Sequence, residues 1–177
     1  MKVHIHQEAE TDYPAVFDLV EKAFRSLEIS DHSEHHLVER LRKSNAFVPE
    51  LSLVACTDDG KIAGHILLTK IKIEDEGKSH ESLILAPVSV LPEFQNRGIG
   101  GQLIRAAHKK ALELGFGSVV LVGHENYYPR FGYELCSKYA IRMPFEVPEQ
   151  NCMVKELFPG ALNKVAGTVQ FDPAFGL

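Results

Sequence analysis

The residues best suited to chemistry in this chain of 177 residues form a glycine-containing run, Gln95–Gly101. An apolar run typical of a buried strand, Leu83–Val90, precedes it, and Leu103, Ala107 and Ala111 follow at helical spacing. A helix N-terminus leaves backbone N–H groups unpaired and carries a partial positive charge. Glycines let a ligand approach those groups closely. The run therefore predicts an anion site suited to a phosphate or a pyrophosphate.

The spacing of the glycines separates three kinds of phosphate site. A P-loop needs a lysine and then Ser or Thr after its last glycine, whereas Gly100 is followed here by Gly101 and Gln102. A dinucleotide fingerprint needs a third glycine at a set distance, and none stands there. What remains is the pattern Gln-x-x-Gly-x-Gly after a strand that ends Val88-Ser89-Val90.

This remaining pattern resembles that of the GNAT superfamily of acyl-CoA-dependent N-acetyltransferases, in the runs Val88–Pro92 and Gln95–Gly100. A second run, Tyr127–Tyr133, places a tyrosine four residues before a glycine–aromatic pair and narrows the resemblance to the YhbS-type bacterial branch. The resemblance extends over nearly the whole chain. It implies an enzyme that uses acetyl-CoA as cosubstrate and transfers the acetyl group to an amine by direct attack.

The resemblance also implies how the cosubstrate is held. Backbone groups of the strand end would bind the pantetheine like an added strand and polarise the thioester oxygen, and the glycine run would bind the pyrophosphate. The residues expected to bind the cosubstrate are Val88, Ser89, Val90, Gln95, Asn96, Arg97, Gly98, Ile99, Gly100, Gly101 and, through its side-chain amide, Asn126.

Tyr128 resembles the general acid of the family, which protonates the CoA sulfur as it leaves, and Tyr127 is the competing candidate. The general base is not identified. Leu83–Val90 contains no carboxylate, so His124 and Glu125, after the next strand, or a water chain are the alternatives.

Strands are predicted at residues 3–7, 51–57, 62–73, 83–90, 116–122 and 167–171. One helix is expected to begin at a Thr11 or Asp12 cap, and a second near Asp31 with Glu34 in a capping box. A third would begin in the glycine run and carry Leu114 on its inward face. In the family pattern the first two helices line the acceptor cleft. The acceptor contacts implied there are Glu28, Asp31, Glu34 and His35.

These elements predict an α/β (α+β) fold with a mixed central sheet and helices on both faces. Antiparallel strands come first, and a parallel pair follows them; the resemblance implies that this pair splays apart at the cofactor site. We expect one domain over residues 1–177. It would contain N-terminal strands and acceptor-side helices at 1–80, an acetyl-CoA core at 81–133 and C-terminal strands at 134–177, where a homodimer contact is possible.

Composition limits the partners. The net charge of −5 disfavours nucleic acid and mildly favours a cationic acceptor, so a small-molecule or peptide amine is expected. Three cysteines without ligand spacing indicate reduced thiols, no metal and a cytoplasmic protein. Neither a signal peptide nor a membrane span is expected. Two other functions stay open: a CoA-binding sensor without catalysis, and an acyltransferase with another acyl chain or a hydroxyl acceptor.

Overall fold

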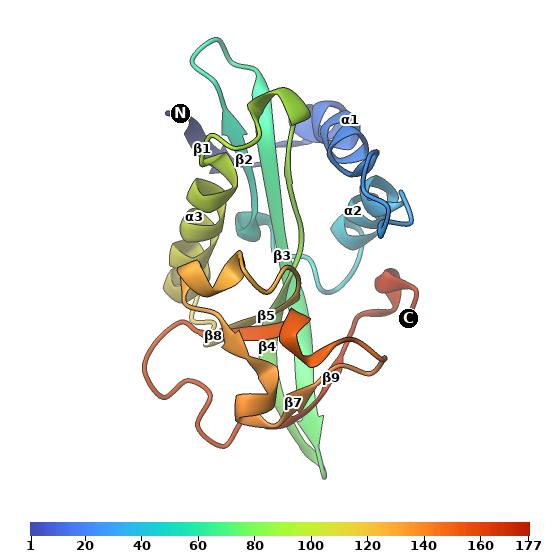
Figure 1. Cartoon of the computed structure of the whole chain (residues 1–177), viewed down its shortest axis with the longest axis vertical. Helices are drawn as coiled ribbons and strands as arrows, with labels where there is room; N and C mark the ends of the chain where they lie inside the picture. The colour runs from blue at the N-terminus through green and yellow to red at the C-terminus, as the bar shows by residue number, and fades with distance from the viewer.

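Nine strands and three α-helices make up the fold, and the computed structural model describes all 177 residues (Figure 1). The strands are β1 (His4–Gln7), β2 (Ser52–Cys56), β3 (Ile62–Asp75), β4 (Lys78–Val90), β5 (Ser118–Val122), β6 (Glu134–Leu135), β7 (Ile141–Arg142), β8 (Cys152–Glu156) and β9 (Gly167–Gln170). The helices are α1 (Tyr13–Phe24), α2 (Glu34–Arg42) and α3 (Ile99–Glu113). Two 3₁₀ turns matter below, η3 (Pro92–Phe94) and η4 (Tyr128–Phe131).

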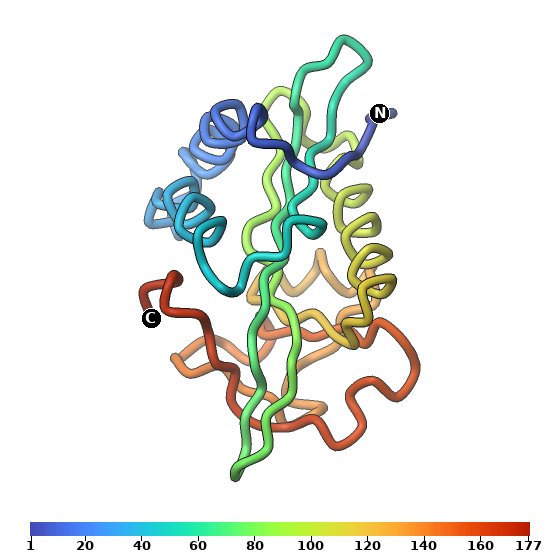
Figure 2. The backbone as a smooth tube through the Cα atoms, turned by 180° about the vertical axis from the view of Figure 1, so that it is seen from behind, coloured from blue at the N-terminus to red at the C-terminus, as the bar shows by residue number.

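The long hairpin of β3 and β4 runs through the middle of the molecule (Figure 1 and Figure 2). Its pairing extends from Gly64 opposite Val90 to the tip at Asp75 opposite Lys78. The two tip residues, Glu76 and Gly77, have φ values of 44° and 81°, the left-handed conformation that a tight hairpin turn requires. β3 ends two residues later than its predicted end at residue 73, and β4 begins five residues earlier than the apolar run indicated, so that only two residues join them.

The sheet is antiparallel from β1 to β4 and then changes direction, in the order β1-β2-β3-β4-β5-β8-β6. β5 pairs parallel to β4 only at Leu83 with Val119 and at Ile84 with Val120. Past Ile84 the two strands separate, so the rest of β4 has no strand on its β5 side. The mixed sheet with a parallel pair that splays is thus confirmed.

Helices cover both faces of this sheet. In Figure 1, α3 lies on one side of the β3–β4 hairpin and α1 and α2 lie on the other. The inward face of α3 buries Leu103, Ala107 and Ala111 fully, as its spacing predicts. Since α3 spans the connection from β4 to β5, this packing fixes where the helix begins relative to the end of β4.

Three details of the predicted helices are wrong. Leu114 is 40% exposed, because α3 ends at Glu113 and the chain turns away before Leu114 can face inward. The Asp31 carboxylate accepts hydrogen bonds from the N–H and hydroxyl of Ser33, so α2 starts only at Glu34 and has no capping box. Asp12 occupies the position before α1, as expected, but its carboxylate accepts from the N–H of Ala9 and makes no capping hydrogen bond to the helix.

Candidate active site

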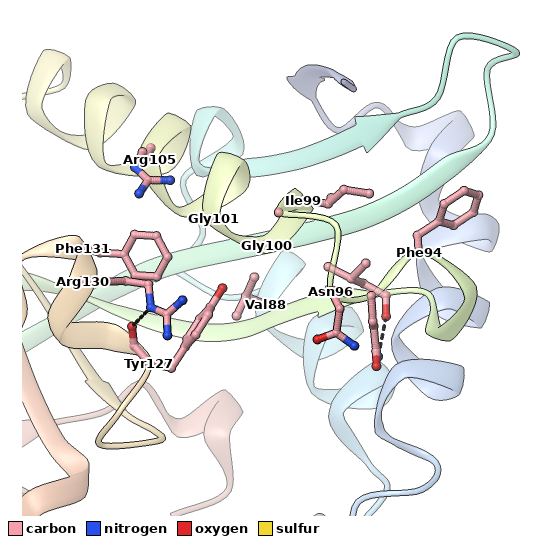
Figure 3. Close-up of a pocket in the computed structure, with 13 residues that line it drawn as sticks. Val88, Phe94, Asn96, Ile99, Gly100, Gly101, Arg105, Tyr127, Arg130 and Phe131 are labelled. Carbon is pink, nitrogen blue, oxygen red and sulfur yellow. Dashed lines mark hydrogen bonds between the residues drawn. The ribbon is translucent and has the colours of Figure 1, made fainter. Parts of the chain in front are cut away.

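A pocket of about 630 Å³ lies between the end of β4, the loop after it, the start of α3 and η4 (Figure 3). Two arginines and no carboxylate line it, so the pocket suits an anion. The lining residues are Val88, Val90, Phe94, Gln95, Asn96, Gly98, Ile99, Gly100, Gly101, Arg105, Tyr127, Arg130 and Phe131.

The loop between β4 and α3 is shaped by two left-handed residues. Asn96 has a φ of 62° and Gly98, which precedes the helix, has a φ of 81°. Asparagine and glycine adopt this conformation more readily than other residues do. The side-chain amide of Gln95 donates to the Val90 carbonyl over 3.1 Å, and this bond ties the loop to the end of β4.

The start of α3 presents free backbone donors to the pocket. The first helical hydrogen bond runs from the Gln102 N–H to the Gly98 carbonyl over 3.2 Å. The amides of Ile99, Gly100 and Gly101 come before it and have no partner within the helix. Free N–H groups and the positive end of the helix dipole meet here.

Gly100 and Gly101 keep this part of the pocket open. A β-carbon on Gly100 would lie 3.1 Å from the Tyr127 hydroxyl. A β-carbon on Gly101 would lie 3.2 Å from Nη1 of Arg105 and 3.3 Å from the Phe131 ring. Side chains at these two positions would therefore fill the space that the free amides face.

The two adjacent tyrosines of η4 occupy different places. Tyr127 lines the pocket, with its hydroxyl beside Gly100 (Figure 3). Tyr128 lies against Gly123, just past the end of β5, where a β-carbon would collide with the Tyr128 ring. Its ring also makes an edge contact with Tyr133, at 5.8 Å between ring centres. Tyr128 is thus close to the point where β4 and β5 separate, and Tyr127 is close to the glycine loop.

Both tyrosines are protonated near neutral pH. Burial, together with the neighbouring Tyr127, raises the pKa of Tyr128 to about 12. Burial also raises the pKa of Tyr127, although Arg130 and Arg105 oppose the shift. Either hydroxyl is therefore in the form that can donate a proton.

Eight of the residues predicted to bind the cosubstrate line this pocket: Val88, Val90, Gln95, Asn96, Gly98, Ile99, Gly100 and Gly101. Ser89, Arg97, Asn126 and Tyr128 do not line it. The side chain of Ser89 is buried on the other face of β4, because successive strand residues alternate. The Arg97 guanidinium lies 5.8 Å from the centre of the Phe94 ring. Asn126 is exposed.

Four lining residues were not predicted as site residues: Phe94, Arg105, Arg130 and Phe131. A signal was available for Arg105, since it follows Gly101 by four residues and a helix brings such positions to one face. Arg130 and Phe131 lie within the Tyr127–Tyr133 run, but this run has no periodicity from which one could predict that their side chains line the pocket.

His124 and Glu125, the alternative bases, are exposed after β5. His124 accepts the Asn126 N–H at Nδ1 over 3.2 Å, a contact within the turn itself. No group of three or more His, Cys, Asp or Glu side chains is arranged to hold a metal ion. None of the helices is both long and apolar enough to cross a membrane.

Comparison with known proteins identifies the sequence pattern. Residues 4–136 match the family described as an acetyltransferase (GNAT) domain. The chain is 36% identical over 152 residues to the uncharacterized N-acetyltransferase YjhQ of Escherichia coli K12, which covers 85% of this chain and 82% of that protein. It is 28% identical over 171 residues to the uncharacterized N-acetyltransferase YhbS of the same strain, over 97% of each.

Solved structures agree with this fold. The crystal structure of the N-acetyltransferase YhbS from E. coli in complex with CoA superposes with a TM-score of 0.88 at 27% identity, over 100% of this chain and 93% of that one. A GNAT family acetyltransferase from Brucella melitensis in complex with acetyl-CoA superposes with a TM-score of 0.78 at 31% identity, over 98% of both chains.

Proposed function

Because this chain belongs to the GNAT acetyltransferase family, we propose that it transfers the acetyl group of acetyl-CoA to an amine by direct attack. The observation that carries the proposal is the set of unpaired amides of Ile99, Gly100 and Gly101 in a pocket without carboxylates. The similar proteins from E. coli and B. melitensis, solved with CoA and acetyl-CoA, support the same cosubstrate.

In this proposal the pyrophosphate binds at the start of α3. The three free amides donate hydrogen bonds to its oxygens, and charged acceptors make such bonds shorter and stronger than neutral ones. The glycines at positions 100 and 101 let the pyrophosphate approach the backbone.

The pantetheine arm is proposed to lie along β4 after Ile84, where β5 no longer pairs with it. Backbone N–H and C=O groups of Val88–Val90 on this side can pair with the pantetheine amides as another strand would. A backbone N–H there can also polarise the thioester carbonyl as negative charge develops on its oxygen.

We assign the general acid to Tyr128. The sulfur is at the far end of pantetheine from the pyrophosphate, so a tyrosine beside Gly100, such as Tyr127, lies at the wrong end. Tyr128 lies at the end of β5, where the two parallel strands part. As the amine nitrogen bonds to the carbonyl carbon and the carbon–sulfur bond breaks, the Tyr128 hydroxyl gives its proton to the sulfur. The nitrogen loses one proton to water as it becomes the amide, and Tyr128 regains a proton from water.

The acceptor is proposed to be a cationic amine that loses a proton before it attacks. The net charge of −5 favours approach of a cation through long-range attraction. The proposal includes no general base within Leu83–Val90, since that segment of β4 carries no carboxylate.

Calorimetric titration of the protein with acetyl-CoA, CoA and NADH, side by side, tests the proposal. Binding of both CoA species with none of NADH is the expected result, followed by thiol release in the presence of an amine. Absence of CoA binding would contradict the site. Binding without thiol release from a broad set of amines would instead indicate a CoA-binding module that lacks catalysis.

A further inference from the structure

Two arginines at one end of the pocket take no part in the proposed reaction. Arg105 extends from α3 and Arg130 from η4. Figure 3 shows both beside Phe131, at the end of the pocket away from Phe94 and Asn96.

The Arg105 guanidinium is positioned without using its donors. Its central carbon lies 4.9 Å from the centre of the Phe131 ring, a cation–π contact. Its Nη1 lies 3.2 Å from the place of a β-carbon on Gly101, so it borders the free amides of α3. It forms no ion pair and no hydrogen bond within the chain, and all five of its N–H groups remain available.

The Arg130 guanidinium is held more tightly and still keeps donors. Its Nε donates to the Tyr127 carbonyl over 2.9 Å, and its Nη2 donates to the Asn126 carbonyl over 3.3 Å. Its central carbon lies 4.8 Å from the centre of the Tyr127 ring. These contacts fix the plane of the group and leave the two N–H bonds of Nη1 unpaired.

The cosubstrate of the proposed reaction carries two separate anionic groups, a pyrophosphate and a ribose 3′-phosphate. The amides at the start of α3 provide donors for the pyrophosphate. The second group is a phosphate monoester, which has a charge of roughly −1.5 to −2 at pH 7. Arginine suits it because the planar guanidinium donates two parallel hydrogen bonds to a phosphate.

We propose that Arg105 and Arg130 together bind the 3′-phosphate of acetyl-CoA, and that they make this protein select acetyl-CoA over 3′-dephospho-acetyl-CoA. The inference rests on the proposed function. In the proposed function the glycine loop binds the pyrophosphate and leaves the 3′-phosphate without a partner. The inference adds the two residues that bind this 3′-phosphate.

The test measures the dissociation constants of acetyl-CoA and 3′-dephospho-acetyl-CoA for the wild type, Arg105→Gln, Arg130→Gln and the double variant. For the wild type we expect a preference of about 10- to 100-fold for acetyl-CoA, the effect of one or two hydrogen bonds to a charged group. In the double variant the ratio is expected to fall close to one, with affinity for the dephospho compound nearly unchanged.

Lys109→Gln is the matched control, because Lys109 is an exposed cation one turn further along α3 and is not in the pocket. It should keep the wild-type ratio. Equal weakening of both ligands by the arginine variants would place these side chains on the pyrophosphate and overturn the inference, as would a wild type without preference. Failure of the wild type to bind either ligand would contradict the proposed function itself.

Discussion

At the scale of single residues, the neighbouring tyrosines of η4 show how one step along the chain changes a role. Tyr127 faces the glycine loop, and Tyr128 faces Gly123 and Tyr133. Neither hydroxyl forms a hydrogen bond within the chain, so both are free to act on a ligand. They differ in their positions along the proposed path of the cosubstrate: Tyr127 lies beside the proposed pyrophosphate site, and Tyr128 lies beside the proposed position of the sulfur.

Tyr128→Phe is expected to lower kcat about 100-fold or more, the usual effect of a lost general acid, with little change in the affinity for acetyl-CoA. Steady-state kinetics with a calorimetric measurement of binding would separate the two effects. Tyr127→Phe is the matched control and should leave kcat close to that of the wild type. The reverse result would assign the acid to Tyr127.

A buried polar cluster connects the N-terminal strands to α2. The Glu8 side chain is only 1% exposed; it accepts hydrogen bonds from Arg42 and Ser52, and His65 lies 3.8 Å away. Burial opposes ionisation of Glu8, but His65, Arg42 and Ser52 outweigh burial and lower the pKa of Glu8 to about 2. The ionised carboxylate therefore stabilises the folded chain.

Because the folded pKa of Glu8 is below its unfolded value, this stabilisation is present at neutral pH and is lost as the pH falls from about 4.5 toward 2. Glu8→Gln should lower the free energy of unfolding at pH 7 by about 3 kcal/mol, since it leaves Arg42 buried without its partner. Urea unfolding from pH 7 to pH 2 would measure this, and the two proteins should converge in acid. A difference between them that is independent of pH would exclude ionised Glu8 as the cause.

Glu21→Gln is a control for the loss of one carboxylate. Glu21 pairs with Arg25 on the exposed surface of α1, and water screens such pairs. Its unfolding curve should stay close to that of the wild type at every pH.

At the scale of elements, the start of α3 is the feature on which binding depends. Gly100 has no positive φ, so other residues can adopt its backbone conformation, and the nearest obstacle to a side chain is the Tyr127 hydroxyl. A substitution there changes the pocket more than it changes the helix.

Gly100→Glu should abolish acetyl-CoA binding while the melting temperature stays close to that of the wild type, because it places bulk and negative charge among the free amides. Gly100→Gln, which has nearly the same size but no charge, should lose less affinity. Calorimetric titration of both variants provides the comparison. If Gly100→Glu keeps the wild-type affinity, the pyrophosphate does not bind at this loop.

At the scale of the whole molecule, the pocket joins parts that are distant in sequence. Its residues come from β4, the loop after it, α3 and η4, and one ligand would contact all four. A ligand that binds the folded chain alone adds its binding free energy to stability. Because β4, β5 and β8 are neighbours in one sheet, we expect a bound ligand to stabilise the strands on both sides of the splayed pair.

Acetyl-CoA at about 100 times its dissociation constant should stabilise the protein by about 2.7 kcal/mol. For a chain of this size that corresponds to a rise in melting temperature of roughly 5–10 °C. Differential scanning fluorimetry measures the rise. NADH at the same concentration should produce none, and a similar rise with NADH would mean that the pocket does not discriminate CoA.

The sequence alone determined the features that depend on neighbouring residues. An apolar run precedes the glycines at positions 98, 100 and 101, and apolar residues at helical spacing follow them. This order predicts the loop, its free amides and the start of α3. The order of strand, helix and strand along the chain likewise predicts the parallel strand pair. Residue type alone does not fix how a helix end is capped, because side chains such as those of Asp12 and Asp31 can hydrogen-bond to several nearby donors.

Only the tertiary structure decided which side chains meet across the pocket. Arg105 and Phe131 are 26 positions apart and make contact because α3 and η4 lie against each other in the fold. Glu8 and Arg42 pair across 34 positions for a similar reason. Such contacts depend on the angles and distances between packed elements, which residue spacing along the chain does not specify. The same packing placed Tyr127 at the glycine loop and Tyr128 at the end of β5.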